Sequence, residues 1–241
     1  MYTRSGTTWT QKAQVGASDA ATGNGGNLGH TLALSGDGST FAVGAPAKSY
    51  SSYGTNTGRV YVFTYDGNTT VSEQAILEAS DVETNMQFGS SMAIDEDGNT
   101  VAVGSKGGTS NTHSQQGAVY IFTRSGTSWT QAQKVISPNP AANAYFGTRV
   151  GNGDGMVDLT SDGRVLVVGA WGSDGTGGAG YAFSRSGNTF TSKIRLEASD
   201  VATNDRNGWS IAVADDGTVL LGSPQDGDGG TNSGSAYVFT I

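Results

Sequence analysis

The sequence contains no cysteine, so it offers neither a disulfide framework nor thiol chemistry. Charged residues make up only 14% of the 241 positions, and 13 basic side chains face 21 acidic ones, for a formal net charge of −8. This balance excludes a nucleic-acid-binding surface, which needs basic side chains to neutralise phosphates, and it disfavours an anionic membrane surface. No apolar run approaches the roughly 18 residues of a membrane span. The first residues lack the apolar stretch of a signal peptide, which indicates an intracellular chain or a mature segment with an added methionine.

Glycine, by contrast, is abundant, with 38 residues. A glycine costs about 1 kcal/mol relative to alanine at each helical position, so this content excludes a helical bundle. Disorder is also disfavoured, because 35% of the residues are hydrophobic and short runs of Val, Ile, Leu and Tyr recur. The sequence therefore predicts an all-β fold of short strands and many turns.

One pattern of segments occurs four times along the chain. A strand of the Val-Tyr-Val-Phe-Thr type ends near Phe63, Phe122, Phe183 and Phe239, at separations of 59, 61 and 56 residues. Before it lies an apolar strand, at 40–44, 100–104, 165–169 and 218–222. An Asp-Gly pair, a strong hairpin signal, joins each apolar strand to a shorter inner strand, at 32–34, 92–94, 157–159 and 211–213. With an outer strand of the Trp-Thr-Gln type, each repeat supplies four antiparallel strands.

Four antiparallel strands in a repeat of about 60 residues predict the blade of a β-propeller. We expect a single domain over 1–241, with repeats at about 2–63, 64–122, 123–183 and 184–241. Residues 7–15 have the sequence of an outer strand, whereas the last segment, which ends at Ile241, is a third strand. Pairing of these two segments is expected to complete the last blade, close a ring of four blades and hide both edges. The alternative is an open array whose ends pair with a second chain in an eight-bladed dimer.

The pairs Phe88-Gly89 and Phe146-Gly147, together with Gly44-Ala45-Pro46, resemble the FG-GAP repeat. The resemblance extends over essentially the whole chain and is to the microbial form of a repeat that also builds the propeller of integrin α subunits. It implies a β-propeller that serves recognition or adhesion, outside the cell or on its surface, rather than catalysis. The chain departs from the integrin pattern in having four repeats instead of seven, and in having Leu28 and Asn207 where other repeats have phenylalanine.

The third repeat carries a candidate metal site between Phe146-Gly147 and its inner strand. Asn152, Asp154 and Asp158 place side-chain oxygens around a glycine bend, as a hard cation such as Ca²⁺ requires. Against calcium, the first position of the binding motif falls on Val150, which has no side-chain oxygen. The alternative is a polar bulge in which Asp158 accepts backbone hydrogen bonds.

The connections between second and third strands are long and polar, and we expect them on the same edge as the connections into the inner strands. Loops held by a rigid scaffold commonly carry binding sites, and aromatic planes beside carboxylates suit a sugar. The predicted ligand-binding residues are Lys48, Tyr50, Tyr53, His113, Trp171, Asp174, Asp226 and Asp228, with Tyr145 and Trp209 near the incoming loops. The alternative for each residue is a solvated loop position or, for Trp209, a place in the core between blades.

Three functions remain open for this chain. The first is a non-catalytic recognition or adhesion module that binds a glycan or a protein. The second is a structural repeat unit of a larger surface protein that associates with itself. Whatever its function, we expect the isolated chain to be a monomer or a homodimer. The third is a glycosidase or lyase, for which Asp174 and Asp226 would have to face each other across the ring axis. Because no catalytic triad, phosphate loop or dinucleotide motif is present, we expect no enzyme activity and no cofactor other than calcium.

Overall fold

A computed structural model describes the chain except for residues 1, 21–25, 51, 108–112, 149–154 and 174–176. The described residues form strands, turns and loops, and no α-helix occurs among them. In this part of the chain there is accordingly no helix that could span a membrane. The expected all-β class is confirmed.

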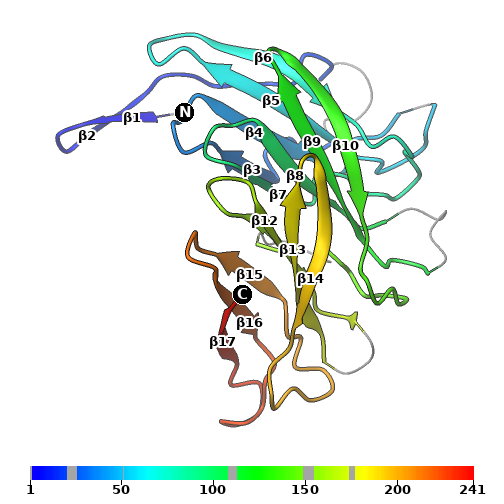
Figure 1. The fold of residues 1–241 in the computed structure, drawn as a ribbon. Helices are drawn as coiled ribbons and strands as arrows, with labels where there is room; N and C mark the ends of the chain where they lie inside the picture. Colours follow the sequence, from blue (N-terminus) through cyan, green and yellow to red (C-terminus); the bar gives the residue numbers. More distant parts are fainter. Residues whose placement is uncertain (1, 21–25, 51, 108–112, 149–154, 174–176) are drawn as a thin grey trace.

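Three sheets of four antiparallel strands follow one another along the chain (Figure 1). The first sheet contains β3 (Thr31–Leu34), β4 (Thr40–Ala45), β5 (Arg59–Tyr65) and β6 (Val71–Leu77). The second sheet contains β7 (Ser91–Ile94), β8 (Thr100–Ser105), β9 (Ala118–Ser125) and β10 (Ser128–Val135). The third sheet contains β11 (Val157–Leu159), β12 (Val165–Ala170), β13 (Ala179–Ser186) and β14 (Thr189–Leu196). Within each sheet the spatial order equals the chain order, as predicted from the repeat.

The ends of the chain differ from the predicted closed ring. The last sheet has three strands, β15 (Ser210–Val213), β16 (Thr218–Ser223) and β17 (Ser235–Thr240), while β1 (Tyr2–Ser5) and β2 (Thr8–Gln11) form a separate hairpin that projects from the row of sheets (Figure 1). Among the described strands, β2 pairs only with β1, so the predicted pairing with the C-terminal strand is wrong for this structure.

The pairing register explains why β2 does not join the last sheet. Thr3 pairs with Thr10 and Tyr2 with Gln11 in the hairpin. In the second sheet, Thr123 and Phe122 pair in the same way with Thr130 and Gln131. The residues of β1 therefore occupy the edge of β2 that the end of β17 would need.

The Asp-Gly hairpins form as the sequence predicts. Gly38 has φ of +70° and Gly98 has φ of +64°, a region that only glycine adopts without steric cost. The carboxylate of Asp37 accepts hydrogen bonds from Ser39 N at 2.8 Å and from Ser35 Oγ at 2.6 Å. These tight turns define one edge of the row of sheets, which we call the turn edge.

The opposite edge, the loop edge, joins each sheet to the next. Gly58 forms a parallel bridge with Phe88, and Gly117 forms one with Phe146. Both glycines have φ above +80°, and a Cβ at either position would clash with the backbone of the bridged phenylalanine. The loops between second and third strands thus lie against the loops that enter the next sheet, as expected.

The core lies between the sheets rather than in one centre. Val60 and Val62 of the first sheet pack with Val103 and Tyr120 of the second. The second and third sheets share a second cluster, which includes Ile121. A third cluster joins the third sheet to the last one. The second and third sheets are therefore covered on both faces by their neighbours, as the near-continuous apolar strands predict.

Candidate functional site

Three aromatic rings gather on the loop edge between the third and last sheets. The rings of Tyr145 and Trp171 are stacked, with centroids 4.4 Å apart and planes 4° from parallel. Trp209 meets Trp171 edge to face at 5.1 Å. The two aromatic residues that the sequence analysis placed near the incoming loops therefore lie against the predicted binding residue Trp171.

Local backbone geometry fixes where these rings point. Trp171 directly follows β12, and its neighbour in the cluster, Tyr145, precedes Phe146 with φ of +53°. The same left-handed conformation occurs at Gln87 and Arg206, which hold the equivalent position in other repeats. A bulky residue with positive φ is uncommon, and here the repeated turn imposes it.

Arg206 completes the cluster. Its guanidinium carbon lies 5.2 Å from the ring centroid of Trp171 and 4.8 Å from that of Trp209, at cation–π distance. Sequence reasoning missed this residue. The available signal was its repeat position, one residue before the Phe-Gly site, where the preceding repeat has Tyr145.

A hollow of about 190 Å³ opens beside the cluster. Its lining combines aromatic, hydroxyl, amide and guanidinium groups from Trp171, Gly172, Ser173, Gly177, Thr203, Asn204 and Arg206. Within the described part of the chain, the buried Nε1 of Trp171 and the buried Oγ of Ser173 have no hydrogen-bond partner. Buried polar groups are nearly always paired, so these two atoms are suited to a ligand or an ordered water.

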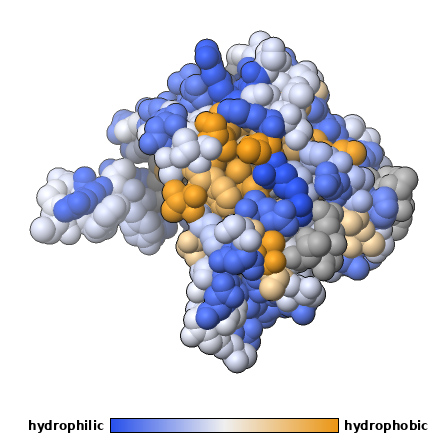
Figure 2. Space-filling view, turned by 60° about the horizontal axis from the view of Figure 1, so that its bottom comes forward, coloured by the Kyte–Doolittle hydropathy of each residue, from blue (hydrophilic) through white to orange (hydrophobic). Residues whose placement is uncertain are grey.

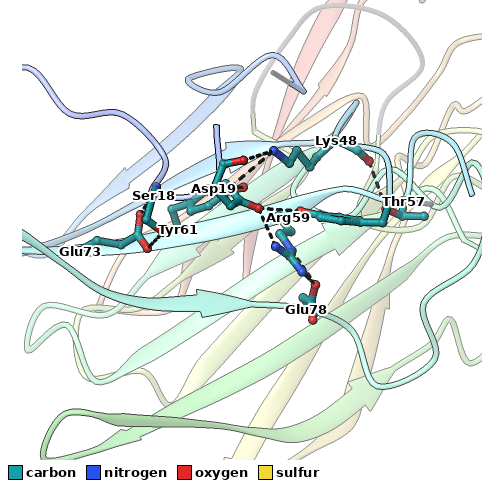
Figure 3. A network of polar contacts seen from close by, with 9 residues as sticks. Ser18, Asp19, Lys48, Thr57, Arg59, Tyr61, Glu73 and Glu78 are labelled. Carbon is teal, nitrogen blue, oxygen red and sulfur yellow. Dashed lines mark hydrogen bonds and ion pairs between the residues drawn. The ribbon is translucent and has the colours of Figure 1, made fainter. Parts of the chain in front are cut away.

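Lys48 belongs instead to a polar network on the first sheet (Figure 3). Lys48 is 1% exposed, and its ammonium group donates to the backbone oxygen of Asp19 at 2.9 Å. The Asp19 carboxylate also accepts from Arg59 at 2.6 Å and from the Tyr61 hydroxyl at 2.6 Å. The expectation that the loop edge presents Lys48 at its surface is therefore wrong, because its charge is neutralised inside the protein.

Tyr50 contributes its ring to the same network. The guanidinium carbon of Arg59 lies 3.8 Å from the ring centroid, and the hydroxyl donates to Asp19 at 3.3 Å. Burial, followed by the neighbouring Tyr61 hydroxyl, raises the pKa of Tyr50, so this phenol stays protonated. Tyr53, by contrast, is 51% exposed on the adjoining loop.

Asp226 and Asp228 lie on the long loop of the last sheet. Asp226 is 2% exposed and accepts hydrogen bonds from the Tyr237 hydroxyl at 2.5 Å and from Asp228 N at 2.9 Å. The Tyr237 hydroxyl lowers the pKa of Asp226, and the negative charge of Asp226 raises the pKa of the exposed Asp228. His113 is half-buried on the loop between β8 and β9 of the second sheet. Asp174 lies outside the described residues.

The candidate metal site is only partly visible, because Asn152 and Asp154 lie outside the described residues. The carboxylate of Asp158 accepts hydrogen bonds from Val213 N at 2.8 Å and from Leu159 N at 2.9 Å, linking β11 to β15. Burial raises the pKa of Asp158 above its ordinary value. No group of three or more metal-binding side chains occurs in the described ranges. Asp158 thus has the backbone partners that the alternative interpretation assigned to it.

Two segments of the chain, residues 71–122 and 190–239, match the FG-GAP repeat family. No curated protein matches the sequence. Among solved structures, hydrazine synthase from Kuenenia stuttgartiensis is similar with a TM-score of 0.49 and 12% identity, over 96% of this chain and 49% of that chain. TolB from Acinetobacter baumannii has a TM-score of 0.45 and 12% identity, over 87% of this chain and 43% of that chain. The chain thus spans less than half the length of either protein.

Proposed function

Because the chain carries FG-GAP repeats, we propose that it is a non-catalytic recognition or adhesion module that acts outside the cell or on its surface. Its ligand is a glycan or a protein, bound on the loop edge at the hollow between Trp171 and Arg206. The observation that carries the proposal is this hollow, where the Trp171 indole and the Arg206 guanidinium line the wall, and where the buried Nε1 of Trp171 and Oγ of Ser173 have no described partner.

The geometry favours a ligand rich in hydroxyl or carboxylate groups. Tyr145 covers one face of Trp171. The polar side chains that line the hollow are those of Ser173, Thr203, Asn204 and Arg206. Arginine donates in a planar fork that matches carboxylates and vicinal acceptors. A glycan with acidic or closely spaced hydroxyl groups fits this donor set best.

The acids of the loop edge support a non-catalytic role. A glycosidase needs one carboxylic acid whose pKa is raised by an apolar environment, so that it remains protonated near neutral pH. The pKa of Asp226 is lowered by the Tyr237 hydroxyl, which keeps this carboxylate ionised. Asp228 is exposed to solvent and lacks such an environment.

The test is binding of the folded chain to a panel of immobilised neutral and acidic glycans, followed by the same measurement on Arg206→Ala. We expect at least tenfold weaker binding, because the charged donor of the hollow is lost. Arg164→Ala is the matched control, since this arginine is 80% exposed on the turn edge and its loss should leave binding unchanged. Equal loss in both variants would indicate non-specific charge binding, and turnover of chromogenic glycosides would instead support an enzyme.

A further inference from the structure

The last sheet exposes an apolar face that no other sheet covers among the described residues. Leu220 of β16 and Val238 of β17 are paired in register and are 48% and 68% exposed. We call the side of a sheet that faces the following sheet its trailing face, and these two residues lie on the trailing face of the last sheet. Paired side chains of this kind form a contiguous apolar surface rather than the scattered single residues that are normal on a protein surface.

The earlier sheets show what normally covers this face. In the repeat, Ala42, Ala102 and Val167 are equivalent to Leu220, and all three are fully buried. The equivalents of Val238 are fully buried as well, namely Val62, Ile121 and Ala182. In each case the burying surface is the next sheet.

The first sheet exposes the opposite, leading face. Leu32 and Leu34 of β3 are 68% and 60% exposed, whereas their equivalents Ile211 and Leu159 are 6% and 7% exposed. This face forms an apolar groove of about 430 Å³ lined by Val15, Leu28, Leu32, Leu34 and Phe41, among others. Figure 2 shows apolar side chains gathered on one side of the molecule, beside the projecting arm.

We propose that the trailing face of the last sheet packs into the leading-face groove of a second copy of this chain. At every junction within the chain, the trailing face of one sheet packs against the leading face of the next. The two exposed faces are therefore one trailing face and one leading face, the same pair that packs at each internal junction. A face of a repeat array that is exposed to solvent is normally polar, whereas these two exposed faces carry Leu32, Leu34, Leu220 and Val238. Two copies joined reciprocally bury both apolar ends and give eight sheets, within the usual range of propellers.

The contact is heterologous, which makes a mixing experiment decisive. Sedimentation of the chain should show twice the mass of one chain at micromolar concentration. Leu220→Asp should reduce this to the mass of one chain, and so should Leu32→Asp, because each variant places a charge in the shared interface. An equimolar mixture of the two variants should recover a dimer, since one intact leading face and one intact trailing face remain available.

Ile194→Asp provides the matched control, because this residue is 44% exposed on the outer strand β14 and lies on neither end of the row. It should leave the mass at that of the dimer, and circular dichroism should show all three variants folded. A wild-type chain that sediments at the mass of one chain, as intramolecular ring closure would give, overturns the proposal. Failure of the mixture to dimerise overturns the head-to-tail geometry, since one intact leading face and one intact trailing face would then not be sufficient for the contact.

Discussion

The hydroxyl of Tyr120 donates a hydrogen bond to Asp81 at 2.8 Å, and Lys134 approaches the same carboxylate at 2.6 Å. Asp81 follows the outer strand of the first sheet, so this contact joins two successive sheets. Tyr61 and Asp19 repeat it at 2.6 Å on the first sheet. The third sheet departs from the pattern, because Asn139 stands at the position of Asp81 and, within the described residues, the buried Tyr181 hydroxyl has no partner.

Asn139→Asp should therefore stabilise the protein. The new carboxylate would accept from Tyr181 and lie near Arg195, the repeat equivalent of Lys134. A hydrogen bond gained by a buried hydroxyl contributes about 1 kcal/mol to the free energy of unfolding. Urea denaturation measures the change. Asp81→Asn, which removes the same pair from the second sheet, should destabilise by a similar amount. A change of the same sign in both variants would contradict the equivalence of the two positions.

Asp19→Asn should destabilise strongly, because it leaves the ammonium group of Lys48 buried without its carboxylate (Figure 3). Breaking one side of a buried ion pair costs about 3 to 5 kcal/mol. In a double-mutant cycle measured by thermal denaturation, Lys48→Met should recover part of this loss in the Asp19→Asn background. Additive losses would show that the two residues act independently.

Gly117→Ala should weaken the junction between the second and third sheets. Its φ of +82° disfavours alanine, and a Cβ there would also clash with the backbone of Phe146. Gly126→Ala is the control, because its φ is +62° but no atom lies within 4 Å of the added Cβ. We expect the control to cost about 1 to 2 kcal/mol from backbone strain alone and Gly117→Ala to cost clearly more, as measured by urea denaturation.

Asp37 should titrate well below an ordinary aspartate. The Ser35 hydroxyl, followed by the backbone N–H of Ser39, lowers its pKa from 3.8 to about 2. Since the folded-state pKa is depressed, the stabilisation that this carboxylate provides is present above pH 3.8 and is lost as the pH falls toward 2.

NMR titration of the carboxyl carbons checks this value directly. Ser35→Ala should move the Asp37 midpoint upward and leave Asp216, whose pKa is lowered by the Thr218 backbone N–H, unchanged. An Asp37 midpoint that does not respond to Ser35→Ala would assign the shift to the backbone alone.

The repeated part of the fold could be predicted from sequence because its signals are local. Asp-Gly pairs set the hairpins, and apolar runs such as Val101–Val103 mark strands buried on both faces. The closed ring could not be predicted reliably, because it depends on competition between two edges. Residues 2–4 repeat the end of a third strand and pair with the neighbouring β2. This pairing closes a short loop and costs less conformational entropy than pairing of β2 with the distant β17.

The candidate site shows a similar division. Trp171, Tyr145 and Trp209 were identifiable as aromatic residues on loops of one edge, and the structure brings them together. Lys48 was misplaced because its partner Asp19 lies 29 residues earlier, in a segment that no local pattern connects to it. Arg206 was missed because a single arginine carries no signal until the rings around it are placed.

The arrangement of the core between successive sheets has a consequence for how such a gene can change. Since each repeat supplies both halves of one kind of junction, duplication or loss of a whole repeat creates no foreign surface inside the protein. Insertion of a partial repeat, by contrast, would leave a leading or trailing face without its partner and expose an apolar surface to water. The length of this protein is therefore expected to vary among descendants in steps of about 60 residues, the spacing of Phe63, Phe122 and Phe183.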